Sequence, residues 1–301
     1  MSNYYYHPKI AYFFMSQSTT RQMLCKILIC NTEYLGFHQF SCPSCDKIKK
    51  VFHTCKSRFC SSCGKKATEQ WIERNLSILP QVPWQHITFP LPQELRDLFW
   101  LNRNLFNHLI KLPAKIITKL AKHKKMLPGI FLALHTFGRD LKPNVHFHLS
   151  TTSGGLSFTH DKWICGFYIH HQKVKSMWKY EVITTLRKLF KNNQLIKLLP
   201  ELKHITDYTS FNKWLDTLYQ KSWVVHLQRT TAHHNKTVKY LDRYLKRPPL
   251  SETRITKYDG ENVTYVYHDH HDNDNKSKTM SVFDFIQHGS SRHLIHPNNQ
   301  I

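Results

Sequence analysis

Two pairs of cysteines, each separated by two residues, are the most specific chemical feature of this sequence. They are Cys42-Pro-Ser-Cys45 and Cys60-Ser-Ser-Cys63, with fourteen residues between the pairs. Each pair can present two thiolates from one tight turn, and four thiolates suit the tetrahedral coordination of zinc. We therefore predict a structural zinc ion held by Cys42, Cys45, Cys60 and Cys63.

A second set of candidate zinc ligands surrounds the two pairs. Cys30 and His38 precede the first pair, whereas His53 and Cys55 lie between the pairs. Cysteine and histidine at such irregular spacing are often core or surface residues, so the residues alone leave open whether one or two zinc ions bind. Seven of the eight cysteines lie between positions 25 and 63. In a reducing compartment this clustering favours metal binding over disulfides.

Two histidines alternate with apolar residues in the segment Asn144-Val-His-Phe-His-Leu149. In a β-strand His146 and His148 point to one face of the sheet, while Val145, Phe147 and Leu149 point to the other. Two imidazoles on one face can share a metal ion. The His-x-His pattern by itself is weak, however, and it is equally typical of packed histidines.

Two tyrosines occur four residues apart in a strongly basic helical segment. The stretch Thr237–Lys246 predicts a helix that Pro248 and Pro249 end, and Tyr240 and Tyr244 share one of its faces. Paired tyrosines on a helix usually pack against a core. Here the neighbouring basic residues favour a nucleic-acid backbone instead, and the candidate DNA contacts are Lys239, Arg243 and Lys246.

The charge of the chain points to an anionic partner. Its 301 residues include 43 Lys and Arg against 20 Asp and Glu, which gives a formal net charge of +23. With 41% hydrophobic residues the chain can bury a core, which excludes a wholly disordered basic tail. Lys56 and Arg58 in the cysteine-rich segment are candidate DNA contacts, although a run of charges is also typical of a solvated surface.

The start of the chain and its hydropathy predict a cytoplasmic location. Met1–Ile10 lacks the charged start and apolar run of a secretory signal, and no window approaches the roughly 18 apolar residues of a membrane span. Binding to DNA would associate the protein with the nucleoid.

The remaining patterns predict a chain of mixed α and β structure. HITFPLP and WVVHLQ indicate strands, GRDLKPN indicates the loop of a hairpin, and Asp259-Gly260 indicates a second hairpin with a third arm near Lys278–Val282. Helical spacing runs from Leu95 to Ile110, over Lys173–Leu199 and near Phe211–Tyr219. We expect an N-terminal segment at 1–20, a zinc-binding DNA-binding module at 21–72, a catalytic domain at 73–250, and a β-hairpin extension with a divergent tail at 251–301.

Three features in this order carry a resemblance to a known family. The basic module CPSCDKIKKVFHTCKSRFCSSCG, the strand NVHFHL followed by SGGL, and the helix YLDRYLKRPP resemble the HUH rolling-circle transposases of the insertion-sequence-ninety-one type, which have two tyrosines. The resemblance covers roughly residues 25–285. It implies an α+β fold in which a small zinc-ribbon-like N-terminal module precedes an HUH nuclease domain with a central antiparallel sheet flanked by helices. The family's upstream Cys, Leu-Gly and His match Cys30, Leu35-Gly36 and His38, which favours two zinc ions.

The resemblance also implies a reaction. His146 and His148, with a third ligand that the sequence does not assign, would hold Mg²⁺ or Mn²⁺ at the scissile phosphate of single-stranded DNA or of the hairpin ends of a mobile element. Tyr240 would form a 5′-phosphotyrosine, and Tyr244 would take the second strand, without ATP or another nucleotide cofactor. The family's chains usually continue into a longer basic C-terminal region, so the segment after about Gln287 predicts a truncated copy.

Two alternatives remain open at this point. The first is a zinc-ribbon DNA-binding protein without catalysis, in which the histidines and tyrosines are packing residues. The second is a rolling-circle replication or conjugative nicking enzyme, which uses the same chemistry and against which only the N-terminal zinc module argues.

Overall fold

The computed structural model describes residues 22, 25–45, 47–57, 60–138, 140–195, 198–229, 250, 252–269 and 272–291. These residues form two compact units. The first unit contains the described residues up to 77 together with 140–141 and 250–291, and the second contains those of 78–138 and 142–229. None of the described helices has the length and apolar character that a membrane span needs.

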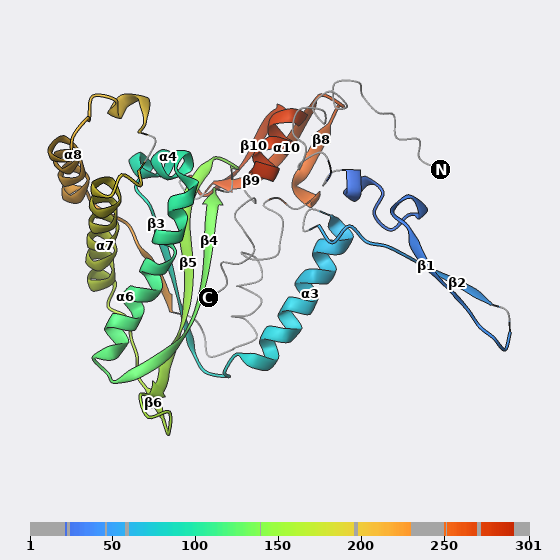
Figure 1. The fold of residues 1–301 in the computed structure, drawn as a ribbon, viewed down its shortest axis with the longest axis horizontal. Coiled ribbons are helices and arrows are strands. Elements are labelled where there is room, and N and C mark those ends of the chain that lie inside the picture. The colour runs from blue at the N-terminus through green and yellow to red at the C-terminus, as the bar shows by residue number, and fades with distance from the viewer. Residues whose placement is uncertain are drawn as a thin grey trace. The chain divides into compact units, whose positions relative to one another are not determined.

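The second unit is built on one antiparallel sheet (Figure 1). Four strands follow the order β4-β5-β3-β7, and the short β6 pairs with β5. Their bounds are β3 (Trp84–Pro90), β4 (Met126–Phe137), β5 (Pro143–Ser157), β6 (Trp163–Cys165) and β7 (His226–Arg229). The hairpin predicted across GRDLKPN is confirmed, because β4 and β5 are antiparallel neighbours.

Helices pack on this sheet and on one another. Helix α4 contacts β5, α6 contacts both β4 and β5, and α7 packs against α6 and α8. The helical segments are α4 (Gln93–Leu101), η2 (Arg103–Leu105), α5 (Phe106–Leu109), α6 (Lys111–Lys122), α7 (His171–Lys191), η3 (Pro200–Leu202) and α8 (Tyr208–Gln220). The helical spacing predicted from Leu95 to Ile110 is divided, because the backbone of Asn102 leaves the helical region at φ −117° and ψ 59°.

The apolar face of β5 meets helix α7. Val145, Phe147 and Leu149 are fully buried. The ring of Phe147 lies 5.6 Å from that of Trp178 on α7, and the Trp178 indole donates a hydrogen bond to the carbonyl of Pro90. The alternation predicted for this strand is confirmed, and the side chains of His146 and His148 therefore belong to the opposite face of the sheet.

The first unit contains two small antiparallel sheets. One pairs β1 with β2, and the other has the order β10-β9-β8. The elements are η1 (Glu33–Leu35), β1 (Phe37–Ser41), β2 (Ile48–Phe52), α3 (Ser61–Ile78), η4 (Glu252–Arg254), β8 (Ile255–Tyr258), β9 (Asn262–Asp269), β10 (Asp274–Ser281) and α10 (Val282–Ser291). The predicted hairpin at Asp259-Gly260 and its third arm are confirmed, whereas the long helix α3 was not predicted.

The fold class is the expected one. The chain combines a cysteine-rich N-terminal part with a central antiparallel sheet on which helices pack. Each of these two features positions a cluster of side chains that can bind a metal ion.

Candidate functional site

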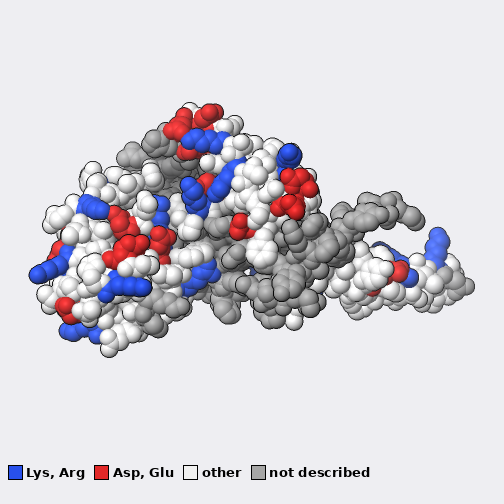
Figure 2. Space-filling view, turned by 90° about the horizontal axis from the view of Figure 1, so that it is seen from above, with Lys and Arg blue, Asp and Glu red and all other residues white. Residues whose placement is uncertain are grey.

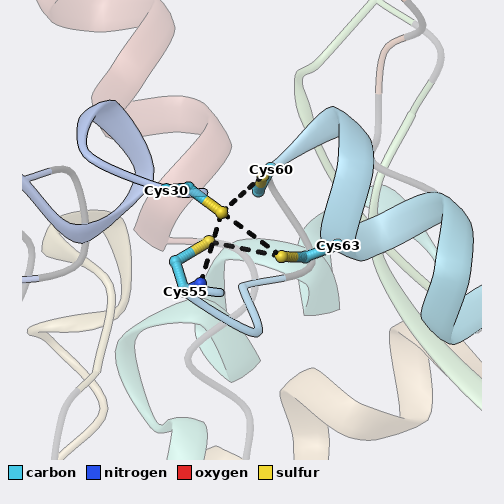
Figure 3. Close-up of side chains that lie close together, drawn as sticks. All are labelled: Cys30, Cys55, Cys60 and Cys63. Carbon is cyan, nitrogen blue, oxygen red and sulfur yellow. Dashed lines mark hydrogen bonds between the residues drawn. The ribbon is translucent and has the colours of Figure 1, made fainter. Parts of the chain in front are cut away.

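Four cysteines converge in the first unit at distances that fit a zinc ion. Sγ of Cys30 lies 3.5 Å from that of Cys63 and 3.7 Å from that of Cys60, and Sγ of Cys55 lies 3.7 Å from that of Cys63 (Figure 3). Four sulfurs at about 2.3 Å from a tetrahedral zinc ion lie about 3.8 Å from one another. The observed separations are close to that value and far longer than the roughly 2 Å of a disulfide.

Local backbone structure brings the four cysteines together. Asn31 adopts a left-handed conformation at φ 61°, and its N–H donates to the carbonyl of His53, which holds the chain at Cys30 beside the chain at Cys55. The N–H of Cys55 also donates to Sγ of Cys30 at 3.3 Å. Cys60 directly precedes α3 and Cys63 lies in its first turn. Anionic sulfur is favoured there by the positive end of the helix dipole.

The structure groups the predicted zinc ligands differently from the expectation. Cys60 and Cys63 lie with Cys30 and Cys55, and Cys42 and Cys45 are not part of the cluster. The reason is that Cys42 and Cys45 lie in the turn between β1 and β2, and each of these five-residue strands extends the chain by about 3.3 Å per residue.

The second predicted set is divided as well. His38 and His53 lie next to each other, with ring centroids 4.6 Å apart, and do not join Cys30 and Cys55. Nδ1 of His53 also lies 3.2 Å from the carbonyl oxygen of Leu35.

The environment of the thiols differs between the two groups. Burial raises the pKa of Cys30 and of Cys55, so these thiols are protonated near neutral pH without a metal ion. A bound zinc dication reverses this effect, because it displaces the thiol protons. Hydrogen bonds from Ser44 lower the pKa of Cys42 to about 7, which makes this thiol more acidic than those of Cys30 and Cys55.

Three histidines converge on the sheet of the second unit. His135 of β4 lies directly opposite His146 of β5, and the ring centroids of His135, His146 and His148 lie 4.7 to 5.2 Å apart. One ligand nitrogen from each ring lies within 4.8 Å of the other two. The separation allows all three imidazoles to bind one ion.

Burial keeps two of these imidazoles, those of His146 and His148, neutral and able to bind a metal. It lowers the pKa of His146 to about 4, helped by the charge of Arg96, and lowers that of His148 well below its ordinary range. Nδ1 of His146 donates to the carbonyl of Asn144 at 2.8 Å, which leaves the lone pair on Nε2. Nε2 of His148 is buried and makes no hydrogen bond among the described residues, which fits an atom that binds a metal.

Sequence reasoning missed two histidines of this region. His135 was not singled out, although a hairpin centred on Asp140 and Leu141 places position 135 opposite position 146. His86 of β3 is also buried, and burial lowers its pKa to about 4. It lies in HITFPLP, whose pattern predicts a strand but does not mark the histidine as part of a site.

The predicted DNA-contacting and nucleophilic residues are mostly outside the described part of the chain. Those outside the described part are Tyr240, Tyr244, Lys239, Arg243, Lys246 and Arg58. Lys56 is described: it is exposed and follows Cys55, and its backbone is left-handed at φ 53°. On the face drawn in Figure 2, basic side chains are interspersed with acidic ones rather than gathered into one patch.

Comparisons with known proteins bear on both clusters. A family model described as "Transposase zinc-binding domain" matches residues 5–91, the region of the four cysteines. A second family model, described as "Putative transposase", matches residues 129–298, which include the three histidines. No solved structure matches the chain.

Two curated proteins are similar over most of the chain. The transposase for insertion sequence element IS801 from Pseudomonas savastanoi pv. phaseolicola is 36% identical over 276 residues, which are 89% of this chain and 66% of that protein. A Sinorhizobium fredii protein named "Putative transposase y4qJ" is 26% identical over 284 residues, 92% of this chain and 70% of that protein. The chain thus spans about two thirds of the length of these relatives.

Proposed function

Because the chain belongs to the transposase family of the insertion-sequence-ninety-one type, we propose that it cuts and rejoins single-stranded DNA at the ends of a mobile element. The observation that carries the proposal is the cluster of three imidazoles on one face of the central sheet. It lies in the part of the chain that is similar to transposases.

The three imidazoles would hold a divalent metal ion. His146 and His148 come from β5 and His135 from β4, and the closeness of the three rings supports His135 as the third ligand that the sequence left open. When bound, the ion would supply Lewis-acid stabilisation of the charge that develops on the scissile phosphate. Imidazole is a softer ligand than carboxylate, which favours Mn²⁺ over Mg²⁺ in solution.

The tyrosines complete the proposal from the sequence. The phenolic oxygen of Tyr240 would attack phosphorus, forming an O–P bond as the bond to the 3′ oxygen breaks, and the phenolic proton would end on the new 3′-hydroxyl. Each step exchanges one phosphodiester for another, so no nucleotide hydrolysis is required. Tyr244 would perform the same exchange on the second strand, while Lys239, Arg243 and Lys246 would bind the DNA backbone.

The zinc module would hold the DNA. Zinc bound by Cys30, Cys55, Cys60 and Cys63 would fix the loop that carries Lys56 against the start of α3. A lysine on a rigid loop can contact phosphate at a lower entropic cost than one on a mobile loop.

Cleavage of labelled oligonucleotides tests this function. Wild-type protein with Mn²⁺ should cleave single-stranded oligonucleotides that contain element ends, and His148→Ala should lower the rate at least 100-fold. His108→Ala, which changes an exposed histidine of α5, should cleave at the wild-type rate. Equal cleavage by His148→Ala contradicts the proposal. DNA binding without cleavage by the wild type supports the zinc-ribbon binding protein instead, and cleavage without rejoining supports a nicking enzyme.

A further inference from the structure

His86 lies beside the three-histidine cluster and is hydrogen-bonded to one of its members. Nε2 of His86 lies 3.2 Å from Nδ1 of His148, and the two ring planes differ by 20° with their centroids 5.4 Å apart. At this separation and angle one ring nitrogen can point at the other, as an N–H···N hydrogen bond requires. On its other side, Nδ1 of His86 lies 3.1 Å from the hydroxyl of Ser150.

Metal binding by His148 would set the direction of these hydrogen bonds. If Nε2 of His148 binds the ion, Nδ1 carries the proton and donates it to Nε2 of His86. Nδ1 of His86 then carries its own proton and donates to Ser150. The hydroxyl of Thr88 lies farther away, 3.4 Å from His148 Nδ1 and 3.5 Å from His86 Nε2.

The two ligands of β5 are therefore held in different ways. Nδ1 of His146 donates a hydrogen bond to the backbone carbonyl of Asn144. A carbonyl can only accept, and no side-chain substitution removes it. Nδ1 of a metal-bound His148 would instead donate its proton to the side chain of His86. The orientation of His148 is the one that a substitution at position 86 can change.

Burial makes the His86 acceptor difficult to replace. His86 is 2% exposed and His148 is 6% exposed, so bulk water does not reach the nitrogens between them. The register of β3 on β5 holds the side chains of His148, His86 and Ser150 next to one another. His86 pairs with Ser150 in this register, and Thr88 pairs with His148.

We infer that His86 is a positioning residue that orients the His148 imidazole for metal binding. His86 itself is not among the clustered ligands. The inference rests on the proposed function, since it requires a metal ion at His135, His146 and His148. Outer hydrogen-bond partners of metal-binding histidines typically contribute 10- to 100-fold to metal affinity.

Mn²⁺ titration of the full-length protein by calorimetry tests the inference. His86→Phe keeps an aromatic ring but removes the acceptor, and it should weaken Mn²⁺ binding about 10- to 100-fold. His86→Gln offers an amide oxygen as acceptor and should bind within about threefold of wild type, a rescue that a purely structural role does not predict. His171→Phe is the matched control, because His171 bonds a backbone carbonyl outside the cluster and should not affect binding.

The outcomes separate this inference from the proposed function. If the wild type binds Mn²⁺, His146→Ala does not, and His86→Phe binds as tightly as the wild type, the inference is overturned and the proposed function stands. Failure of the wild type to bind Mn²⁺ overturns the metal site of the proposed function, and the inference with it. If His86→Phe does not fold, Ser150→Ala decides: affinity lowered severalfold supports the inference, and unchanged affinity overturns it.

Discussion

Replacing Cys55 by serine should remove the zinc ion from the first unit, whereas replacing Cys42 should not. Cys55 belongs to the observed cluster of four sulfurs, and Cys42 lies in the turn of the β1–β2 hairpin outside it. The two substitutions are chemically identical and lie in the same module. They therefore distinguish the structural grouping of the ligands from the grouping that the paired spacing predicts.

The size of the effect follows from the geometry of the cluster. Sulfur separations of 3.5 and 3.7 Å already match a tetrahedral zinc site, so little reorganisation opposes binding. Structural zinc contributes about 10 to 16 kcal/mol of apparent binding free energy. Shared among four thiolates, this is about 3 kcal/mol for each ligand, so Cys55→Ser should lower zinc affinity roughly 100-fold or more.

Competition with a zinc chelator gives the affinity, and elemental analysis gives the stoichiometry. Cys42→Ser should hold the ion with an affinity within about threefold of wild type, and Cys165→Ser serves as a control outside the module. The reasoning is refuted if Cys55→Ser retains the wild-type affinity while Cys42→Ser loses the ion. If the wild type contains more than one zinc ion per chain and Cys42→Ser contains less, the prediction of a second zinc ion is supported.

Three further results are expected. Alkylation by iodoacetamide near pH 7 should modify Cys42 faster than Cys165, because Ser44 lowers the Cys42 pKa to about 7; peptide mass spectrometry measures both rates. The pKa of His86 is about 4 when folded against 6.5 ordinarily, so its contribution to stability is complete above pH 6.5 and is lost as the pH falls toward 4. Urea unfolding without added Mn²⁺ measures this loss. Between pH 7.5 and 5, the free energy of unfolding of the wild type should fall by about 2 kcal/mol more than that of His86→Gln. Gly155→Ala should lower the melting temperature, at a cost of roughly 1–3 kcal/mol, because a Cβ there would lie 2.4 Å from the Leu127 carbonyl oxygen; an unchanged melting temperature in calorimetry would contradict the pairing of β4 with β5.

The sequence predicts best where a short period decides the structure. Alternation along β5 separates His146 and His148 from Phe147, since successive residues of a strand face opposite sides whatever lies around them. The hairpin loops were found because glycine, proline and asparagine mark turns. His135 was missed because its role depends on register across β4 and β5, which a single strand does not contain.

The grouping of the zinc ligands was less accessible to sequence reasoning. Spacing within a Cys-x-x-Cys pair shows that two sulfurs can converge, but it does not show which turns face each other. Here the β1–β2 hairpin holds one pair in its turn, and the unpredicted helix α3 holds the other pair at its N-terminus. The helix expected at Thr237–Lys246 lies outside the described residues, so Tyr240 and Tyr244 stay predictions.

A covalent protein–DNA adduct is the most direct measurement of the central claim. Wild-type protein incubated with Mn²⁺ and labelled single-stranded oligonucleotides should give an adduct that resists denaturant, and mass spectrometry should map the 5′-phosphate to Tyr240 or Tyr244. The His146→Ala variant should give no adduct, whereas His108→Ala should give the wild-type amount. An adduct on a residue other than these tyrosines, or an equal amount of adduct in His146→Ala, would contradict the account.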